Sequence, residues 1–359
     1  MKPDFWHDKK VLVTGHTGFK GSWLSLWLQS MGARVTGFSL DKPSSPCLFD
    51  LAGAADGINN VTGDVRDVAQ LTSCMSEHGC EIIIHLAAQS LVRRSYREPL
   101  ETYSTNVMGT ANVLEAARAA SGVRVVVIVT SDKCYENREQ LAGYREDDPM
   151  GGYDPYSSSK GCAELATAAW RNSYFNPAEY DSHGVAVASA RAGNVIGGGD
   201  WGEHRIIPDI MEAFNAGEAV HLRNPDAIRP WQFVMEPLNG YLALAERMWN
   251  DGVTYSRAWN FGPAEDDLQS VAWLTDQLAG RWGAEARRDI SKEQHPHEAT
   301  LLKLDSSRAS SELNWRSLLS SGETLDWIME WYQGYYHGAD VRQITINQIQ
   351  RFQEKVLHD

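Results

Sequence analysis

The chain alternates short apolar runs with longer segments of helical periodicity. The apolar runs are Lys10–Thr14, Arg34–Ser39, Asn60–Thr62, Glu81–His85, Val123–Val129 and Val185–Arg191. Continuous β-branched and apolar runs of this length are typical of parallel strands that are buried on both faces. Strands that alternate with helices in this way predict an α/β fold, here a Rossmann-type doubly wound parallel sheet.

The pattern changes after Arg191. A glycine-rich loop at 192–201 precedes a predicted helix at 207–216, a strand at 219–222, a helix at 236–249 and a strand at 258–262 that returns to the sheet. The chain has no internal repeats and no low-complexity linker. We therefore expect a smaller α/β domain, residues 193–231 and 263–359, that is interleaved with a doubly wound domain, residues 1–192 and 232–262.

Composition and charge narrow the class of protein. With 43% hydrophobic and 22% charged residues over 359 positions, the chain resembles an ordinary folded protein. Its formal net charge of −14 disfavours nucleic-acid and anionic-membrane partners, and no run approaches the ~18 apolar residues of a membrane span. The five cysteines form no CxxC pair and no zinc-binding spacing, so we expect reduced thiols, no metal site and a cytoplasmic protein.

A glycine-rich turn lies between the first predicted strand and a helix predicted at 22–31. Its sequence is GHTGFKG. In a strand–turn–helix unit, such glycines allow a tight turn and let the backbone approach a pyrophosphate at the helix N-terminus. The spacing is G-x-x-G-x-x-G, whereas the usual fingerprint is G-x-G-x-x-G. The candidate dinucleotide-binding residues in this turn are Gly15, Thr17, Gly18, Phe19, Lys20 and Gly21.

Residues after the next three strands extend this candidate site. Asp41 follows the second strand, where an acidic residue binds ribose hydroxyls and rejects a 2′-phosphate, which favours NAD over NADP; Ser39 competes for this position. After the third strand, Asp64 could bond the adenine amino group or cap the helix that begins near Asp67. The remaining candidates for cofactor contact are Val65 and the small-residue segment Leu86, Ala87 and Ala88.

The stretch YSSSK, from Tyr156 to Lys160, follows a turn-rich segment and opens an alanine-rich helix. Residues four apart share one helix face, so the phenol and the ammonium can reach a single site. A nearby cation favours a phenolate, which could take a proton from a sugar or alcohol hydroxyl near neutral pH. The spacing alone is common, and two solvated residues at the start of a surface helix are the alternative.

Polar residues also follow the fifth strand, at the sheet edge where ligands bind in doubly wound folds. They form the run Ser131-Asp132-Lys133-Cys134-Tyr135. In the long helix before this strand, Asn106 is more polar than packing requires. This indicates a distortion of the helix or a bound water.

These motifs together resemble a known family. The GxxGxxG turn, the serine after the fifth strand and YSSSK are similar to those of the extended short-chain dehydrogenase/reductases. The run SDKCY is similar to the Thr-Asp-Glu-Val-Tyr segment of the nucleotide-sugar 4,6-dehydratases. Nearly the whole chain resembles their CDP-glucose branch, through FWHDKKVLVTGHTGFKGSWLSLWLQ, GYDPYSSSKGCAE, RAGNVIGGGDW, RNPDAIRPWQ and HPHEA.

The resemblance implies a reaction in which NAD takes a hydride and returns it. Tyr156, together with Lys160, would contact the cofactor and remove the proton of the sugar 4-hydroxyl, while Ser131 would bond the same hydroxyl. Loss of water across carbons 5 and 6 would then give CDP-4-keto-6-deoxyglucose, a precursor of O-antigen-type deoxysugars. NAD would occupy the doubly wound domain and the nucleotide sugar the smaller domain.

Lys133 departs from the wider family. In the related dehydratases an aspartate is the acid for the 6-hydroxyl, and the following glutamate is the base at carbon 5. Asp132 fits the acid, but Lys133 stands in place of the glutamate. A neutral lysine could act as the base, whereas a charged lysine could stabilise the enolate or hold Asp132 while another group acts as base.

The resemblance also implies where the nucleotide sugar binds. An arginine side chain can bond two phosphate oxygens at once, which suits a diphosphate. The candidate substrate-binding residues are Gln89, Tyr135, Asn194, Arg205, Arg223, Arg229, Asn260 and His297.

Three alternatives stay open at this point. A nucleotide-sugar 4-epimerase needs no acid/base pair after the fifth strand, so Asp132 and Lys133 favour dehydration. A dehydratase for another nucleotide sugar is equally compatible with these motifs, and a non-catalytic NAD(H)-sensing protein would not need Ser131, Tyr156 or Lys160. The resemblance further implies a homodimer, or a higher homo-oligomer, through helices near 100–120 and 160–175.

Overall fold

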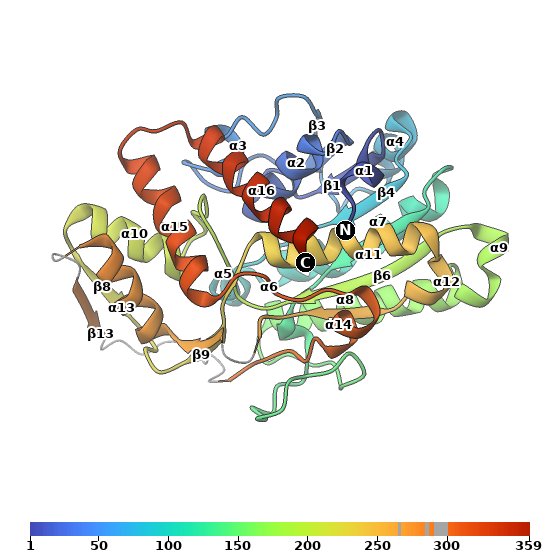
Figure 1. Cartoon of the computed structure of the whole chain (residues 1–359). Helices are drawn as coiled ribbons and strands as arrows, with labels where there is room; N and C mark the ends of the chain where they lie inside the picture. The colour runs from blue at the N-terminus through green and yellow to red at the C-terminus, as the bar shows by residue number, and fades with distance from the viewer. Residues whose placement is uncertain (265–266, 284–286, 291–300) are drawn as a thin grey trace.

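The computed structural model describes residues 1–264, 267–283, 287–290 and 301–359. A seven-stranded parallel sheet forms its centre, with the strand order β11-β6-β5-β4-β1-β2-β3. The prediction of a doubly wound parallel sheet is confirmed (Figure 1). The strands are β1 (Lys10–Thr14), β2 (Arg34–Ser39), β3 (Asn59–Thr62), β4 (Ile82–His85), β5 (Val125–Val129), β6 (Ala186–Ala192) and β11 (Ala258–Phe261).

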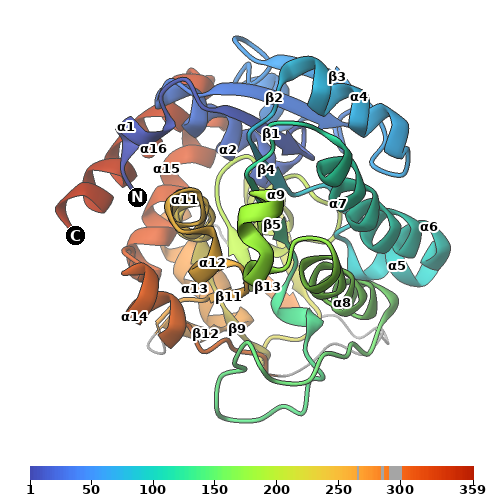
Figure 2. The same cartoon turned by 90° about the vertical axis from the view of Figure 1, so that its right-hand side faces the viewer.

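Helices cover both faces of this sheet (Figures 1 and 2). Successive strand residues point to opposite faces, so Val11 and Leu12 belong to two different apolar clusters. The cluster of Val11 includes residues of α2 (Phe19–Ser30), α11 (Met235–Asn250), α15 (Ser321–Tyr336) and α16 (Val341–His358). The cluster of Leu12 includes residues of α4 (Val68–His78) and α7 (Gly109–Ala119), with Trp170 of α8 (Pro155–Ser173) packed against it.

The remaining elements are short or belong to the smaller part of the molecule. Two-stranded sheets pair β10 with β7, β12 with β9 and β13 with β8. These strands are β7 (Val195–Ile196), β8 (Ala219–Leu222), β9 (Ile228–Pro230), β10 (Gln232–Phe233), β12 (Leu268–Ser270) and β13 (Arg287–Ile290). The other α-helices are α1 (Pro3–Trp6), α3 (Leu48–Leu51), α5 (Val92–Arg97), α6 (Pro99–Tyr103), α9 (Tyr180–His183), α10 (Ile206–Ala216), α12 (Gly252–Tyr255), α13 (Val271–Trp282) and α14 (Ser307–Leu313).

The C-terminal helix α16 packs on the first helix of the doubly wound part. The rings of Trp27 and Phe352 are 5.8 Å apart edge to face, and Trp27 Nε1 donates to Gln353 Oε1 at 3.1 Å. A single apolar cluster therefore runs through residues from both predicted domains. The assignment of residues 263–359 to the smaller domain stays a prediction. Helix α16 lies within this range and packs on the sheet of the doubly wound part.

Two local differences from the predicted elements concern ligand-binding segments. Helix α2 begins at Phe19 and not at Ser22, because Gly18 is its N-cap and the second half of the glycine turn is already helical. The predicted long helix around Asn106 is divided into α6, a π-helical segment (Ser104–Met108) and α7. This confirms the distortion that the buried amide of Asn106 indicated, and such π segments are frequent at functional sites.

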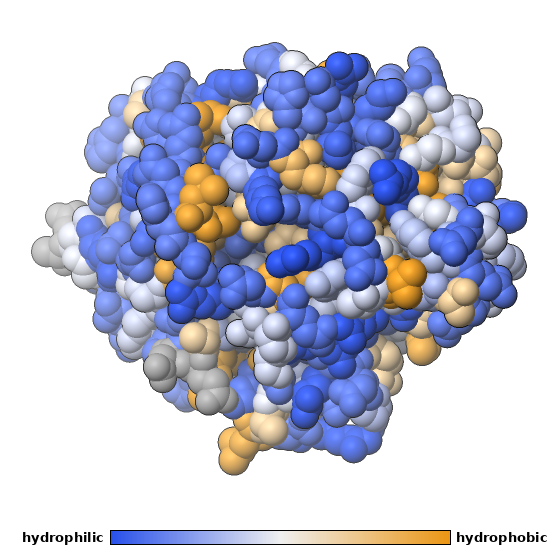
Figure 3. All heavy atoms as spheres, turned by 45° about the vertical axis from the view of Figure 1, so that its right-hand side comes forward, coloured by the Kyte–Doolittle hydropathy of each residue, from blue (hydrophilic) through white to orange (hydrophobic). Residues whose placement is uncertain are grey.

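The outer surface is mainly polar. In the view of Figure 3 the apolar residues form small, separate groups on a hydrophilic face. The segment between β5 and α8 projects from the body of the molecule at the bottom of Figures 1 and 2. Within the described ranges, no helix has both the length and the apolar character needed to cross a membrane.

Candidate active site

One large cavity of ≈ 1210 Å³ lies across the carboxyl ends of the parallel strands. Doubly wound folds bind their ligands at this edge. The cavity brings most of the sequence-predicted residues together. They are Gly15, Thr17, Gly18, Phe19, Lys20, Gly21, Asp41, Asp64, Val65, Leu86, Ala87, Ala88, Gln89, Ser131, Lys133, Tyr135, Tyr156, Lys160, Asn194, Arg205, Arg223 and Arg229.

The glycine turn has the geometry that a dinucleotide requires. Gly15 has a φ of +74°, and a Cβ built on it would lie 2.7 Å from the backbone nitrogen of Ala87. A Cβ on Gly21 would lie 2.1 Å from the carbonyl oxygen of Gly15. Only glycine therefore allows the end of β1, the start of α2 and the Ala87 segment to meet, which leaves the first turn of α2 open to a phosphate.

Asp41 and Ser39 have separate roles at the end of β2. Ser39 is buried, and its Oγ hydrogen-bonds with Thr17 Oγ1 at 2.8 Å and His16 Nδ1 at 3.2 Å. Asp41 is exposed at the cavity, where its Oδ1 accepts the N–H of Lys42 at 2.7 Å. Of the two residues, Asp41 is the one with a carboxylate oxygen available to a ligand.

Asp64 does not cap α4. The N-cap of that helix is Asp67, whose Oδ1 accepts the N–H groups of Ala69 and Gln70. Asp64 lines the cavity and instead pairs with Arg66, whose backbone and guanidinium both donate to it. This hydrogen bonding lowers the pKa of Asp64. The capping alternative for Asp64 is therefore wrong, and adenine contact stays a prediction.

Tyr156 and Lys160 both line the cavity from α8, but burial dominates their protonation. Burial raises the pKa of Tyr156 to about 12, and hydrogen bonding with Ser131 and the charge of Arg205 offset this only in part. Burial also lowers the pKa of Lys160 to about 8, and its Nζ donates to the carbonyl oxygen of Val129 at 3.2 Å. Burial therefore opposes a phenolate at Tyr156, and in this arrangement the Lys160 ammonium donates to the end of β5. The role of the pair as a base stays a prediction.

Asp132 and Lys133 differ in their access to the cavity. Asp132 is fully buried and does not line it, whereas Lys133 does. Asp132 Oδ1 accepts the Ser131 hydroxyl at 2.9 Å and lies 3.5 Å from Lys133 Nζ. Its Oδ2 has no hydrogen-bond partner in the described part of the chain. The structure therefore places the ammonium of Lys133 at the cavity surface and the carboxylate of Asp132 directly behind it.

Lys20 adds a cation at the start of α2. Burial lowers its pKa to about 7, and the like charges of Arg205 and Lys160 act in the same direction. It forms no hydrogen bond or ion pair with the residues that the structure describes. Because a cation at a helix N-terminus is also disfavoured by the helix dipole, this part of the cavity is suited to an anionic ligand.

The predicted diphosphate-binding side chains also line this cavity, and the charge of Arg205 acts on both Lys20 and Tyr156. Arg205 is oriented by Asp200 Oδ2 at 2.9 Å and Ser90 Oγ at 3.0 Å. Arg223 donates to the carbonyl oxygen of His204 at 3.1 Å. Asn194 lines the cavity with an Oδ1 that is buried and has no partner among the described residues, so a ligand donor would satisfy it.

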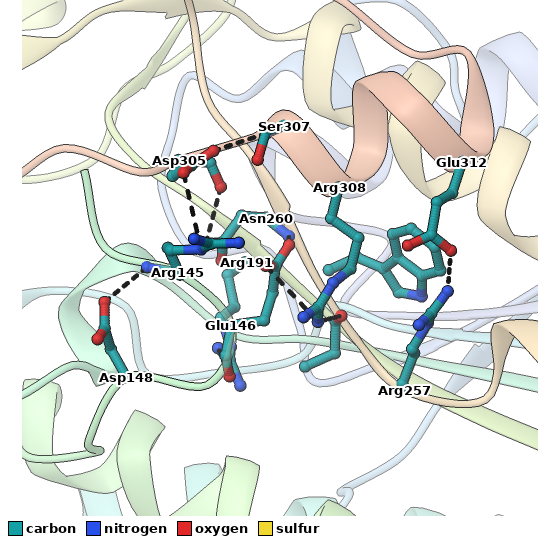
Figure 4. Close-up of polar contacts among 12 residues, drawn as sticks. Arg145, Glu146, Asp148, Arg191, Arg257, Asn260, Asp305, Ser307, Arg308 and Glu312 are labelled. Atoms are coloured by element: carbon teal, nitrogen blue, oxygen red, sulfur yellow. Dashed lines mark hydrogen bonds and ion pairs between the residues drawn. The ribbon is translucent and has the colours of Figure 1, made fainter. Parts of the chain in front are cut away.

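Asn260 lies outside this cavity. It is fully buried, and its Oδ1 accepts the hydroxyl of Tyr135 at 2.7 Å. Its Nδ2 donates to the carbonyl oxygens of Tyr144 at 2.8 Å and Asp305 at 3.2 Å. Figure 4 shows Asn260 beside Glu146, whose Oε1 accepts its backbone N–H at 3.0 Å. The structure thus places Asn260 in a polar core outside the cavity lining, and its contact with a substrate stays a prediction.

His297 lies outside the described residues, so the structure does not place it. Gln89 does line the cavity, and it is held by Asn106, whose Oδ1 accepts its N–H at 2.8 Å and whose Nδ2 donates to its carbonyl oxygen at 3.0 Å. Asn106 Nδ2 also donates to Ser159 Oγ at 2.8 Å. The π segment therefore connects the end of β4 to the YSSSK stretch.

Several functional candidates were missed by sequence reasoning. Glu164 is buried next to Lys160 and pairs with Arg191 at 2.7 Å. Its spacing of four residues from Lys160 was a signal that could have identified it. Asp200, His204, His221 and Asn224 also line the cavity. His221 lies in β8 and the other three lie in loops, and none of these segments carries a comparable pattern.

The chain is similar both to a protein family and to an individual named enzyme. The family described as GDP-mannose 4,6 dehydratase matches residues 12–326. The chain is 52% identical over 338 residues to CDP-glucose 4,6-dehydratase of Salmonella typhimurium, and this covers 94% of each chain.

Two solved structures share the fold. One is dTDP-glucose 4,6-dehydratase from Bacillus anthracis in complex with NAD, with a TM-score of 0.76, 19% identity, and coverage of 92% of this chain and 98% of that chain. The other is UDP-glucuronic acid 4-epimerase from Bacillus cereus in complex with UDP-glucuronic acid and NAD, with a TM-score of 0.77, 19% identity, and coverage of 91% and 100%. At this level of identity, these similarities concern the fold alone.

Proposed function

The chain belongs to the nucleotide-sugar dehydratase family of extended short-chain dehydrogenase/reductases, and from this membership we propose that it converts CDP-glucose into CDP-4-keto-6-deoxyglucose. It is a hydro-lyase whose reaction includes an internal oxidation and reduction. One observation carries the proposal. A single cavity is lined by the glycine turn, by Ser131, Lys133 and Tyr156, and by arginines that would bind a diphosphate.

We propose NAD as the cofactor. The glycine turn supports this, because a Cβ at Gly15 would occupy the space where the backbone must pass. Asp41 would accept hydrogen bonds from the adenosine ribose, and its charge would repel the additional phosphate of NADP. When bound, NAD accepts the hydride from sugar carbon 4 and supplies the hydride to carbon 6.

Tyr156 and Ser131 would act on the sugar 4-hydroxyl. Tyr156 would remove the hydroxyl proton, and Ser131 would share the charge that develops on Tyr156 and on the sugar oxygen. The interactions with Ser131 and Arg205 support this role because both lower the pKa of the Tyr156 phenol. Lys160 would contribute its positive charge from the next turn of α8.

Lys133 and Asp132 would carry out the loss of water. Lys133 reaches the cavity, and its Nζ lies 3.5 Å from Asp132 Oδ1. In its neutral form Lys133 would accept the proton of carbon 5, and Asp132 in its acid form would give a proton to the leaving 6-hydroxyl, so that water departs. The distance between the two side chains would then let Lys133 return its proton to Asp132. Asp132 Oδ2, which has no partner among the described residues, would reach the 6-hydroxyl after a small displacement of Ser131 or Lys133.

The decisive experiment is incubation of the protein with CDP-, dTDP-, GDP- and UDP-glucose or -mannose plus NAD. We expect a 4-keto product that has lost its 6-hydroxyl, from CDP-glucose and with no net change in nicotinamide absorbance. A product that retains the 6-hydroxyl would indicate an epimerase. Net accumulation of reduced nicotinamide would contradict the internal return of the hydride, and a preference for another nucleotide would contradict the choice of CDP.

We further propose that the protein is a homodimer through α6, the π segment and α8. Leu100, Met108 and Leu165 expose 84%, 55% and 60% of their surface on these elements, which lie next to one another in Figure 2. Light scattering should give the mass of a dimer for the wild type and of a monomer for Leu165→Glu. The matched control is Leu357→Glu, because Leu357 is 59% exposed on α16; a monomeric wild type would contradict the proposal.

A further inference from the structure

Tyr156, Lys160 and Glu164 occupy successive turns on one face of α8. Tyr156 and Lys160 line the cavity, whereas Glu164 is 5% exposed and lies one turn behind them. A carboxylate in such a position is costly to desolvate and adds no apolar packing. The packing of α8 on the sheet therefore does not explain why a carboxylate occupies this position.

Glu164 connects α8 to the end of β5 and to β6. Its Oε1 accepts the hydroxyl of Thr130, and its Oε2 accepts Ser189 Oγ and Arg191 Nη2, both at 2.7 Å. Thr130 lies between Val129, whose carbonyl oxygen accepts Lys160 Nζ at 3.2 Å, and Ser131. Through Thr130, Glu164 thus holds the segment of β5 that orients both Lys160 and Ser131.

The charge on Glu164 is maintained by Arg191. Burial raises the pKa of Glu164, but the charge of Arg191 and the hydrogen bonds from Arg191, Thr130 and Ser189 together outweigh burial, and the pKa is lowered. Arg191 Nη1 also contacts the Tyr135 hydroxyl at 2.6 Å and the carbonyl oxygen of Glu146 at 3.1 Å. Figure 4 shows Arg191 next to Glu146 and Asn260 in this polar core. Glu164 is therefore an anion in the folded protein.

Other ionisable groups around Lys160 do not replace this charge. Burial raises the pKa of Cys134 well above its ordinary value, and burial lowers the pKa of His85 to about 3, so both are neutral at neutral pH. Lys20 carries the same sign as Lys160 and repels it. Among the effects on Lys160, burial lowers its pKa and Glu164 is the largest that raises it.

We propose that Glu164 is a positioning residue for proton transfer, which keeps Lys160 in its charged form beneath Tyr156 and holds the end of β5 that presents Ser131. The catalytic consequence of this inference rests on the proposed function. The charge of Lys160 does not rest on that function, because it can be measured in the free protein. Arg171, further along α8, interacts with the charges of both Glu164 and Arg191, and its side chain is retained in all the variants below.

The first measurement is the charge of Lys160 in the absence of cofactor and substrate. Trace acetylation with acetic anhydride as a function of pH, read by mass spectrometry of the peptide that contains Lys160, reports its neutral fraction. In Glu164→Gln we expect the midpoint to move to lower pH by about one unit, since a nearby opposite charge shifts a pKa by roughly one to three units. An unchanged midpoint would overturn the proposal.

A purely structural role must be separated from this effect, because Glu164→Gln leaves Arg191 buried without its partner. The double variant Glu164→Gln/Arg191→Met removes both charges, which is often tolerated when one unpaired charge is not. The proposal predicts the same shift of the Lys160 midpoint in the double variant. Ser189→Ala is the matched control, because it removes one hydrogen bond to Glu164 and leaves the charge; its midpoint should equal that of the wild type.

The second measurement is the dependence of kcat on pH. If Lys160 acts as the ammonium, the alkaline limb of the profile falls as Lys160 loses its proton. That limb should move to lower pH in both Glu164 variants and stay in place in Ser189→Ala. A wild type without turnover would contradict the proposed function alone. If the wild type turned over normally and the alkaline limb fell at the same pH in every variant, the role of Glu164 would be overturned and the proposed function would stand.

Discussion

At the scale of single residues, the protein places its ionisable groups in surroundings that change their chemistry. Burial moves the pKa of Tyr156 to about 12, that of Lys160 to about 8 and that of Lys20 to about 7. Their ordinary pKa values lie close together, at 10.0 for the tyrosine and 10.5 for the two lysines, and in the cavity they spread from about 7 to about 12. The two lysines are thereby brought close to neutral pH, where a group that exchanges protons is most effective, whereas burial opposes ionisation of Tyr156.

The pair Asp132 and Lys133 allows a test at this scale. In Lys133→Met and Asp132→Asn, we expect loss of water from the substrate to slow by about 10²–10⁴-fold, the usual contribution of a positioned acid or base. Cofactor binding should be unchanged, because neither side chain lies at the glycine turn. Product analysis by mass spectrometry and quenching of tryptophan fluorescence by NAD measure the two properties.

The control for these variants is Lys355→Met, in which an exposed lysine that pairs with Glu323 is removed from the C-terminal helix. It should retain full activity. Wild-type dehydration by Lys133→Met would show that this lysine has no catalytic role, and Asp132 would then have to act without it.

At the scale of elements, the cavity is formed by the ends of strands and the beginnings of helices. The glycine turn shows the physical constraint most clearly. A Cβ on Gly15 would meet the Ala87 backbone, and its φ of +74° is one that only glycine adopts without strain. The turn therefore combines a conformational requirement with a steric one, and the two can be separated by experiment.

We expect Gly15→Ala to weaken NAD binding by at least about tenfold, because the end of β1 must shift away from the Ala87 segment. Gly184→Ala is the matched control, since Gly184 has a similar φ of +66° with nothing within 4 Å of the added Cβ. It should lose about 1–2 kcal/mol of stability, as expected for a left-handed non-glycine residue, and keep its NAD affinity. Calorimetric titration and thermal unfolding measure the two effects; equal NAD affinities would contradict the steric argument.

At the scale of the whole molecule, buried polar contacts hold segments that are distant in sequence. Glu236, in the first turn of α11, accepts the N–H groups of Leu318 and Leu319 through Oε1 at 2.9 and 2.7 Å. Its Oε2 has no partner within the described residues. Burial raises the pKa of this carboxyl from its ordinary value of 4.5 to about 8. The group is therefore protonated in the folded protein at neutral pH.

This protonation makes stability depend on pH. Below pH 4.5 the Glu236 carboxyl is protonated in both states. Between about 4.5 and about 8 only the folded state retains the proton, so the free energy of unfolding decreases as the pH rises. The decrease is on the order of a few kcal/mol, at 1.36 kcal/mol for each pKa unit.

Chemical denaturation at a series of pH values tests this expectation. Glu236→Gln should be less sensitive to pH than the wild type over this interval, because an amide cannot gain the charge that burial opposes. Glu77→Gln, in which an exposed carboxylate of α4 is replaced, should follow the wild type. If the wild type and Glu236→Gln lost stability equally as the pH rose, Glu236 would not be the group responsible.

The fold and most of the cavity lining followed from local sequence. Strands β1 and β2 were predicted to the residue, since their apolar runs are bounded by polar residues and a turn. The spacing of the glycine turn, Asp41 and YSSSK likewise predicted residues that line the cavity. The boundaries of the two domains stay a prediction. The packing of α16 on α2 was not readable from local sequence, because contacts such as Trp27 with Phe352 join residues from opposite ends of the chain.

What the sequence determined by itself was the set of elements, the residues at the carboxyl edge of the sheet and, through its motifs, the family of reactions. Only the tertiary structure decided which of those residues face the cavity. Asp132 and Asn260 are buried behind it, and Glu164 supports Lys160 from within the core. The reason is physical: burial, charge pairing and hydrogen bonding depend on neighbours that the folded chain brings from distant positions, and these neighbours decide the protonation and the direction of each side chain.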